Sequence, residues 1–247
     1  MKKTLSFLYG LVCYLAFLST ILYAIGFVGN LLVPKTIDSE PQVPLFNAMM
    51  IDACLLLVFA VQHSVMARPG FKSYWIKIIP EHLERSTYVL LASLCLMLLM
   101  WQWQPVGGIV WSIEEEIPTK LLVAAYFLGW ALVFASTFLI NHFDLFGLRQ
   151  VWLYYRGKPY MPLAFRSPLL YKLVRHPLYL GFIIAFWSTP VMTPAHLLFA
   201  ILTTGYILTA IQFEEKDLLK TFGEKYRNYR SWVPMIIPFS KRKMAKK

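Results

Sequence analysis

Four long, largely apolar segments of this chain are each long enough to cross a membrane as a helix. They cover about residues 5–33, 44–66, 87–104 and 119–141, and a spanning helix needs about 20 mostly apolar residues. Hydrophobic residues make up 58% of the 247 residues, and charged residues only 15%. A water-soluble domain of this length has no core large enough to bury so much apolar surface. The sequence therefore predicts an all-α, polytopic transmembrane helical bundle.

A fifth apolar region, about 177–211, is too long for one upright helix and contains Pro190 and Pro194. Proline inside a helix removes a hydrogen bond and clashes with the preceding turn. We therefore expect two shorter helices that form a C-terminal hairpin, which either spans the membrane fully or re-enters it. Beyond the hairpin, residues 212–230 carry apolar side chains at helical spacing between charges, which predicts an amphipathic cytoplasmic tail helix.

Positive charge is distributed very unevenly along the chain. All the Lys and Arg residues except Lys35 and Lys120 lie in the N-terminus, the loops 67–86 and 142–176, or the tail from 212. Cytoplasmic segments of membrane proteins are enriched in Lys and Arg. We therefore expect an integral protein of the inner, cytoplasmic membrane with both termini in the cytoplasm. The net charge of +11 suits the lipid bilayer surface, and no recognised nucleic-acid-binding module is present, so no nucleic-acid partner is expected.

The three cysteines, Cys13, Cys54 and Cys95, each stand alone in an apolar run. None has a Cys-x-x-Cys partner or clustered histidines, so neither a disulfide framework nor a metal site is expected. The N-terminal Lys2-Lys3 pair and the apolar run after it could be mistaken for a signal peptide. That run has no small-residue cleavage site at the expected place, so we expect an uncleaved first span.

Three polar clusters lie at the ends of the predicted spans, at one cytoplasmic depth, and could converge on one pocket. They are Gln62–Ser64, with Asp52 about three turns deeper, then Glu84–Tyr88, and Asn141–Asp144. Polar residues inside a membrane are costly and usually functional. The alternative is that these side chains cap helix ends or extend to the interface.

Two further clusters lie in the C-terminal part of the chain. In Arg175-His176-Pro177-Leu178-Tyr179-Leu180-Gly181, His-Pro predicts an extended histidine before a helix that starts at the proline. The free N–H groups at that helix start can receive an anion, and Gly181 allows close approach of backbone or ligand. Glu214 and Glu215, expected one turn past the hairpin, suit a ribose diol, an ammonium or an arginine; the alternative is a solvated helix end.

The order of these C-terminal elements resembles that of a known group of enzymes. Arg-His-Pro-x-Tyr-x-Gly, the hairpin, Glu-Glu-x-x-Leu, Phe222-Gly223-x-x-Tyr226-x-x-Tyr229 and Val233-Pro234 resemble the C-terminal half of membrane methyltransferases. That group includes isoprenylcysteine carboxyl methyltransferases and phospholipid N-methyltransferases. The resemblance, over about 171–238, implies that S-adenosylmethionine (SAM) binds at the cytoplasmic face. It further implies that the cofactor contacts are Arg175, His176, Pro177, Tyr179 and Gly181, and that Glu214 and Glu215 hold the ribose or the methionine amine.

A narrower resemblance extends over the rest of the chain. Phe59–Arg68, Glu84–Val89 and Asn141–Gln150 are similar to the bacterial methanethiol S-methyltransferases, which make dimethyl sulfide, and NnrU-type membrane proteins share weaker versions of the first two. This resemblance implies methanethiol as the small-molecule substrate. We therefore expect an N-terminal four-helix transmembrane region, 1–141, and a cytoplasm-facing SAM-binding region with hairpin and tail, 142–247.

Methyl transfer from a sulfonium to a thiol needs a thiolate held in line with the methyl group. A general base, or a cation that lowers the pKa of the thiol, is therefore useful. His63 and His142 are the candidate bases, Asp144 can orient a histidine, Arg85 can favour the thiolate, and Tyr88 can hydrogen-bond it. Two alternatives stay open, a methyltransferase acting on a lipid or isoprenylcysteine and a non-catalytic NnrU-like protein. The sequence does not indicate the oligomeric state.

Overall fold

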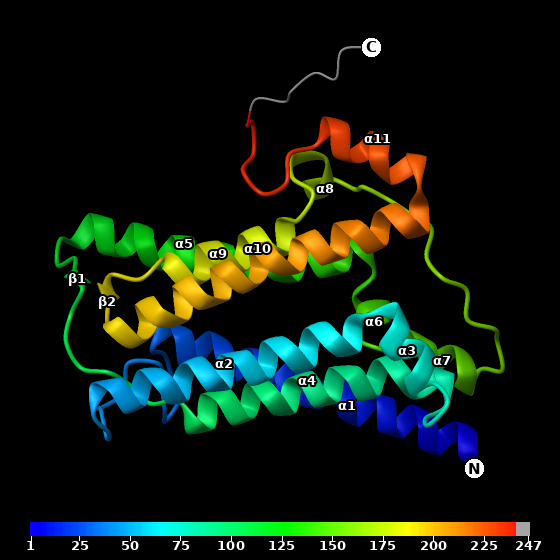
Figure 1. Cartoon of the computed structure of the whole chain (residues 1–247), viewed down its shortest axis with the longest axis horizontal. Helices are drawn as coiled ribbons and strands as arrows, with labels where there is room; N and C mark the ends of the chain where they lie inside the picture. Colours follow the sequence, from blue (N-terminus) through cyan, green and yellow to red (C-terminus); the bar gives the residue numbers. More distant parts are fainter. Residues whose placement is uncertain (241–247) are drawn as a thin grey trace. The chain divides into compact units, whose positions relative to one another are not determined.

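The computed structural model describes residues 1–240, whose regular secondary structure is almost entirely helical (Figure 1). Among these residues, five helices are long and apolar enough to cross a membrane, and they are α1 Lys2–Gly29, α2 Leu45–Ala67, α4 Glu81–Gln102, α5 Glu116–Ile140 and α10 Pro194–Phe222. The shorter helices are α3 Pro69–Trp75, α6 His142–Leu145, α7 Leu148–Tyr155, α8 Leu170–Leu173, α9 Pro177–Trp187 and α11 Glu224–Trp232. The short strands β1 Trp111–Ser112 and β2 Val191–Met192 pair antiparallel. This architecture confirms the predicted all-α, polytopic membrane bundle.

The four predicted spans correspond to α1, α2, α4 and α5, with ends shifted by a few residues. The largest shift is at α4, which begins at Glu81, six residues before the apolar run. Its first turn carries Glu81 and Glu84, and negative side chains are favourable near a helix N-terminus. Polar residues therefore extend the helix beyond the apolar part that the hydropathy pattern detects.

The prediction of a hairpin is confirmed for the break and wrong for the lengths of its two helices. The chain leaves helix after Trp187 and re-enters it at Pro194, where proline is tolerated because a first-turn N–H has no helical partner. However, α9 has 11 residues while α10 has 29, so α10 alone is long enough to span the membrane. Glu214 and Glu215 consequently lie inside α10 and not beyond its end.

The predicted single tail helix at 212–230 is also wrong, because Gly223 divides it. This glycine has φ +53°, a left-handed conformation that most other residues avoid. The end of α10 and the separate helix α11 therefore lie on either side of it. Five basic residues of the predicted tail lie outside the described residues, and they are Lys241, Arg242, Lys243, Lys246 and Lys247.

Contacts divide the chain into two compact units. The first unit consists of Met1–Ser112, His142–Pro162 and Val191–Leu202, and the second of Ile113–Asn141, Leu163–Pro190 and the described residues of Thr203–Lys247. Helix α10 therefore contributes its first turns to one unit and the remainder to the other. The expected regions 1–141 and 142–247 are a division by function, which compactness does not test, and they stay a prediction.

In the first unit, α1, α2 and α4 pack together, and α7 lies against α1 (Figure 1). Ser6 of α1 lies 3.0 Å from the His82 imidazole at the start of α4, and the His82 ring stacks on Tyr154 of α7 with 3.6 Å between ring centroids. The N-terminus, the loop 67–86 and the segment 142–162 therefore meet at one end of this unit. Those basic segments that belong to the first unit thus lie together.

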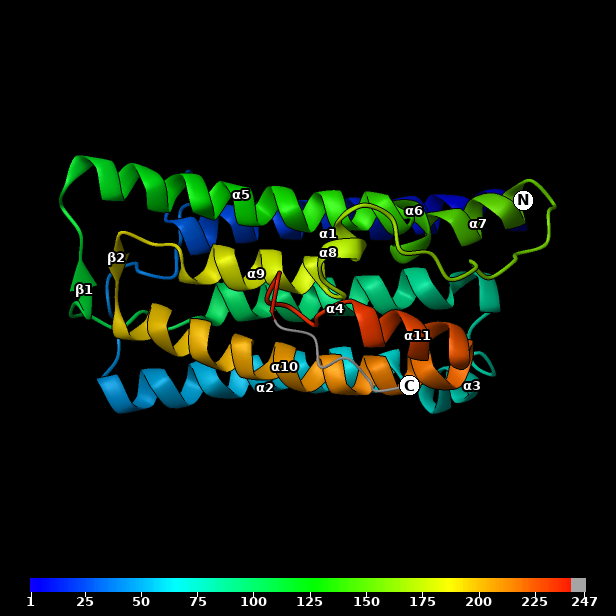
Figure 2. The same ribbon diagram turned by 90° about the horizontal axis from the view of Figure 1, so that it is seen from above.

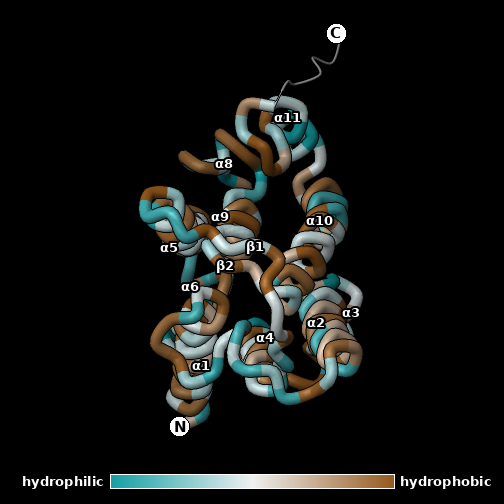
Figure 3. The backbone as a smooth tube through the Cα atoms, turned by 90° about the vertical axis from the view of Figure 1, so that its left-hand side faces the viewer, coloured by the Kyte–Doolittle hydropathy of each residue, from teal (hydrophilic) through white to brown (hydrophobic). Residues whose placement is uncertain are grey.

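In the second unit, α5 and α9 lie side by side (Figure 2). Their backbones approach closely at Gly129 and Gly181, where a Cβ on Gly181 would lie 2.6 Å from the Gly129 carbonyl oxygen. Small residues allow such close approach between helices in membranes. Figure 3 shows apolar residues along the long helices and hydrophilic residues gathered on α11. Helix α11 therefore has the composition of an element outside the hydrocarbon region.

Candidate functional site

The side chain of Glu215 is the centre of an ion-pair network in the second unit. It is only 5% exposed, and its Oε1 accepts a hydrogen bond from Arg175 Nε at 2.7 Å and lies 3.1 Å from His176 Nε2. Its Oε2 lies 3.3 Å from Arg230 Nε. Burying a carboxylate is unfavourable unless it is paired and hydrogen-bonded, and here both oxygens have cationic or polar partners. We call Arg175, His176, Glu215 and Arg230 the Glu215 network.

The local sequence explains how Arg175 and His176 reach this position. Pro177 is the first residue of α9, as the His-Pro pair predicts. His176 before it is non-helical, with φ −126° and ψ 63°, but its ψ lies below the expected extended range. The carbonyl groups of 233–235 accept hydrogen bonds of 2.6–3.2 Å from the guanidinium and backbone of Arg175 and the backbone of His176. The chain after α11 therefore holds the start of α9 in place.

Glu214 is adjacent to Glu215 but has a different environment. It is half-buried, and its Oε2 accepts a hydrogen bond from the Tyr179 hydroxyl at 2.9 Å. Across residues 1–240, no hydrogen-bond donor contacts its Oε1. Consecutive residues of an α-helix point about 100° apart, so the two carboxylates face different surroundings. Both oxygens of Glu215 are engaged within the protein, while Glu214 has a hydrogen bond on one oxygen.

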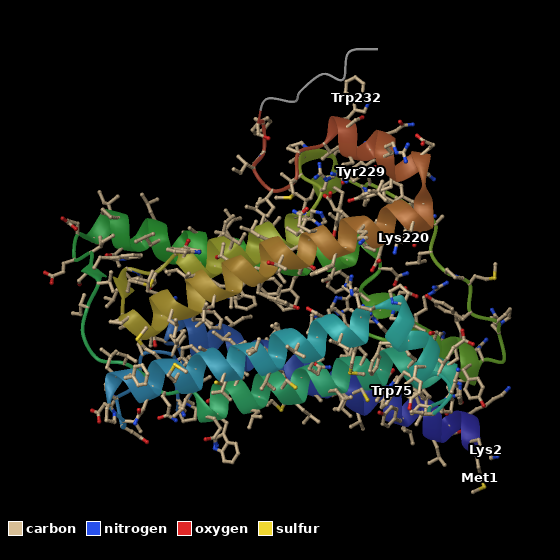
Figure 4. The ribbon with its side chains drawn as sticks, viewed as in Figure 1. Met1, Lys2, Trp75, Lys220, Tyr229 and Trp232 are labelled. Atoms are coloured by element: carbon tan, nitrogen blue, oxygen red, sulfur yellow. The ribbon has the colours of Figure 1, made fainter. Side chains whose placement is uncertain are left out.

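Two tyrosines of α11 lie beside this network. Tyr229 is labelled in Figure 4, and its hydroxyl donates to the backbone carbonyl of Tyr171 at 2.5 Å. The Tyr226 hydroxyl is buried and has no hydrogen-bond partner in the described part of the chain, and its ring packs against Phe165 and Tyr229. Burial raises the pKa of Tyr226, and the neighbouring charge of Glu215 adds to this rise. Tyr226 is therefore a neutral hydroxyl at physiological pH.

In the first unit, His63, Arg85 and Tyr88 form one cluster, which we call the His63 cluster. The Tyr88 hydroxyl lies 3.0 Å from Nδ1 and 3.1 Å from Nε2 of His63. The Arg85 guanidinium lies 4.9 Å from the centre of the Tyr88 ring, and its Nε donates to the Leu145 carbonyl at 2.7 Å. These contacts place an imidazole close to a fixed positive charge, a combination that favours formation of a thiolate.

His142 makes a second histidine–tyrosine pair in the same unit. Its Nε2 lies 2.8 Å from the Tyr14 hydroxyl, and the side chain is buried. Phe146 contacts the His142 ring and stacks on Phe17 with 3.8 Å between centroids, and both phenylalanines pack against the hydrophobic cluster that contains Tyr88. Burial lowers the pKa of His142, which leaves a neutral imidazole able to accept a proton.

Asp144 joins α6 to the segment that follows α7. Its carboxylate accepts hydrogen bonds from Arg149 Nη1 at 2.7 Å and from the Tyr160 hydroxyl at 3.4 Å. Gln150 Nε2 donates to its backbone carbonyl at 3.1 Å. These contacts stabilise the turn between α6 and α7. Its predicted role of orienting a histidine stays a prediction.

The structure thus brings together Arg175, His176 and Glu215 in one unit, and His63, Arg85 and Tyr88 in the other. Gly181 lies in the α5–α9 contact, where a Cβ would also lie 2.9 Å from the Val133 backbone nitrogen. The structure gives it a role in helix packing, and the cofactor contact inferred for it stays untested.

Two members of the site were not predicted from the sequence. Arg230 lies on α11 and Tyr14 inside an apolar run. Arg230 is one of several basic residues in a charged helix, and Tyr14 is one of several aromatic residues in a span, so neither has a distinguishing sequence signal. Within residues 1–240, no group of three or more His, Cys, Asp or Glu is placed to hold a metal ion.

Comparison with known proteins gives close full-length relatives. The methanethiol S-methyltransferase of Crocosphaera subtropica is 55% identical over 239 residues, which cover 97% of this chain and 94% of that protein. The methanethiol S-methyltransferase of Mycobacterium tuberculosis is 54% identical over 242 residues, 98% of this chain and 99% of that protein. A nurim homologue of Drosophila pseudoobscura pseudoobscura is 33% identical over 181 residues, 70% of this chain and 71% of that protein. No family model and no solved structure matches the sequence.

Proposed function

The chain belongs to the methanethiol S-methyltransferase family, and from that premise we propose a complete reaction and its residues. The protein is an integral membrane enzyme that methylates methanethiol. To this the proposal adds SAM as the methyl donor, dimethyl sulfide as the product, and the cytoplasmic face of the bacterial inner membrane as the place of reaction. The observation that carries it is the identity of 50–55% to proteins of this name over nearly the whole chain.

Glu214 is the residue best suited to hold the cofactor. Its Oε1 accepts no hydrogen bond from residues 1–240, while its Oε2 is oriented by Tyr179. A carboxylate with one free oxygen suits the ribose hydroxyls or the ammonium of SAM, which are donors. Arg175, His176 and Glu215 then act as supports, because their ion pairs fix the start of α9 beside α10. When bound, SAM supplies a methyl group on a positively charged sulfonium.

The His63 cluster is suited to activate the thiol. In the proposal, His63 accepts the proton of the methanethiol S–H group, and the Arg85 guanidinium stabilises the thiolate sulfur that remains. Tyr88 orients the imidazole through its hydroxyl, 3.0 Å from Nδ1. The thiolate held there would be the acceptor of the methyl group that SAM supplies. His142, neutral and paired with Tyr14, is the second candidate base, with Asp144 as its possible orienting group.

The surroundings of the His63 cluster suit a small apolar substrate. Phe17, Phe71 and Phe146 pack against the hydrophobic cluster around Met66 and Tyr88. Such walls offer contact to a methyl group and few hydrogen bonds to larger polar molecules. Methanethiol has one methyl group and one ionisable sulfur, so it matches an aromatic wall beside a base and a cation.

The distribution of charge supports the proposed orientation. In the first unit, the N-terminus lies at the same end as α3 and α7 (Figure 1). This end carries Lys2, Lys3 and the basic loop 67–86, which the positive-inside rule assigns to the cytoplasm. His63 lies in the last turns of α2, near this end. The proposed thiol chemistry therefore takes place near the cytoplasmic boundary, which methanethiol reaches from the bilayer.

The activity is tested by supplying methanethiol and SAM to membranes that contain the protein. Headspace gas chromatography should detect dimethyl sulfide, and membranes from an empty-vector strain should not produce it. Parallel reactions with a phospholipid and with a prenylated thiol test the other membrane methyltransferase activities. Product from either lipid, with no dimethyl sulfide above the empty-vector level, would refute the proposal.

The cofactor assignment is tested by binding, separately from activity. Isothermal titration calorimetry of the purified protein with S-adenosylhomocysteine should show that Glu214→Gln weakens binding by about 10-fold or more, as expected for a hydrogen bond to a charged group. Glu224→Gln is the matched control, because Glu224 is an exposed residue of α11 paired with Arg227. Equal affinity of Glu214→Gln and Glu224→Gln would contradict the role of Glu214.

A further inference from the structure

The Tyr226 hydroxyl is a buried polar group that the folded chain does not satisfy. The residue is 1% exposed, and no group within residues 1–240 makes a hydrogen bond with its hydroxyl. Buried hydroxyl groups are nearly always hydrogen-bonded, because leaving one unpaired costs free energy. A sequence that needed only a ring at this position could use phenylalanine without that cost. The hydroxyl therefore indicates a partner other than the described chain.

Tyr229, one turn further along α11, is a tyrosine whose hydroxyl is hydrogen-bonded within the protein, and it serves as the comparison for Tyr226. Both rings pack against Phe165, with centroids 5.7 Å from Tyr226 and 5.2 Å from Tyr229. The Tyr229 hydroxyl donates to the Tyr171 carbonyl and so joins α11 to α8. The two side chains have similar burial partners and differ in their hydroxyl groups, which makes them a natural pair for comparison.

The surroundings of Tyr226 connect it to the proposed cofactor site. Arg230, four residues after Tyr226 on α11, lies 3.3 Å from Glu215, and Glu215, Arg175 and Glu214 are the charged groups that act on the Tyr226 hydroxyl. Arg175 and Glu215 are bound to each other at 2.7 Å, whereas Glu214 keeps one oxygen without a donor from the described residues. Two unused hydrogen-bonding positions, one acceptor on Glu214 and one hydroxyl on Tyr226, thus lie in the same polar neighbourhood of the second unit.

We propose that Tyr226 is a cofactor-binding residue whose hydroxyl donates a hydrogen bond to the nucleoside part of SAM. This inference rests on the proposed function. The acceptor is an uncharged oxygen or ring nitrogen, because Glu214, whose carboxylate has no ion-pair partner among residues 1–240, would repel the methionine carboxylate. Arg175 and Arg230 compensate the charge of Glu215, so the repulsion comes from Glu214. The nucleoside carries the uncharged acceptors, in its ribose and adenine.

The test compares Tyr226→Phe with Tyr229→Phe in the purified full chain, measuring binding and thermal stability in each. Two ligands are titrated by calorimetry, S-adenosylhomocysteine, which has the nucleoside and the amino-acid part, and 5′-methylthioadenosine, which has the nucleoside alone. Tyr226→Phe should weaken both ligands by the same factor, about 3- to 10-fold, as expected for one neutral hydrogen bond. Without ligand, its Tm should equal or exceed that of the unmodified protein.

Tyr229→Phe should give the opposite pattern, a lower Tm from the lost bond to Tyr171 and unchanged affinity for both ligands in the folded protein. The inference is overturned if Tyr226→Phe binds both ligands as tightly as the unmodified protein. It is equally overturned by a loss confined to S-adenosylhomocysteine, or by a drop in Tm without ligand, which would show that the hydroxyl is bonded inside the protein. If the unmodified protein binds neither ligand, the proposed cofactor itself fails, which is a different result.

Discussion

In the second unit, the Glu215 network consists of one buried carboxylate and its cationic or polar partners. In the first unit, by contrast, the His63 cluster consists of aromatic rings, one cation and a histidine–tyrosine hydrogen bond. The carboxylate of Glu215 has partners at 2.7, 3.1 and 3.3 Å. His63 has the Tyr88 hydroxyl at about the same distance from both ring nitrogens. The first of these arrangements compensates a buried carboxylate with two arginines, whereas the second contains a cation and no carboxylate.

This difference matches the two tasks of the proposed reaction. A polar cofactor must be held in one orientation, and paired buried charges provide a rigid support for the residue that contacts it. A thiol must lose a proton, and a neutral imidazole beside an arginine favours that loss. Rigid support and chemical reactivity are therefore assigned to different kinds of cluster, and substitutions in each should affect different measurements.

The largest effect is expected from replacing the proposed base. His63→Gln should lower kcat for dimethyl sulfide formation by about 10²- to 10⁴-fold, because the thiol proton loses its acceptor. Affinity for S-adenosylhomocysteine should not change, since the Glu215 network and Glu214 are intact. Headspace kinetics and calorimetry on the same preparation measure the two quantities. A large loss in His142→Gln with little loss in His63→Gln would transfer the role of base to His142.

The next largest effect is expected on stability, from the ion-pair network. Glu215→Gln removes the charge that Arg175, His176 and Arg230 share, and breaking a buried ion pair typically costs about 3–5 kcal/mol. The thermal unfolding midpoint in detergent should therefore fall strongly. Glu214→Gln is the control, because it makes the same substitution at the adjacent residue. Its Tm should change little, since the amide oxygen still accepts a hydrogen bond from Tyr179. Equal Tm values for the two variants would remove the distinction between the adjacent glutamates.

A smaller effect on stability is expected at the contact between α5 and α9. Gly181→Ala places a methyl group 2.6 Å from the Gly129 carbonyl oxygen, and such overpacking costs about 1–3 kcal/mol. Gly205→Ala is the control, because no atom of the described chain lies within 4 Å of its added methyl group. We expect a lower Tm for Gly181→Ala alone, with normal cofactor affinity. Weaker cofactor binding at an unchanged Tm would instead support a direct contact of Gly181 with the cofactor.

The smallest effect is a pH dependence that arises from His142. Burial lowers its pKa from the ordinary 6.5, so below that pH the unfolded chain binds a proton that the folded chain does not. Folded stability should therefore be complete above about pH 6.5 and decrease as the pH falls. The Tm of the unmodified protein should drop by a few degrees more than that of His142→Gln between pH 7.5 and pH 5.5. Identical pH profiles would show that His142 titrates alike in both states.

The positions of the helices could be predicted from the sequence because they depend on local patterns. Apolar runs of sufficient length located α1, α2, α4 and α5, and the His-Pro pair located the first residue of α9. The errors occurred where one residue outweighs a pattern. Gly223 interrupts a helical spacing of apolar and charged residues that is otherwise continuous. The residues beyond 211 are polar, so the hydropathy pattern does not detect the last turns of α10.

The sequence by itself determined that the chain is a helical membrane protein and predicted that its basic segments lie on one side, because hydrophobicity and charge act along the chain. Only the tertiary structure separated Glu214 from Glu215 and Tyr226 from Tyr229. Adjacent or similarly spaced residues of one type look equivalent in a sequence. Their difference depends on which of them meets Arg175, Arg230 or the Tyr171 carbonyl, which come from α11 and from the segments before α9. Such contacts between distant segments exist only after the chain has folded.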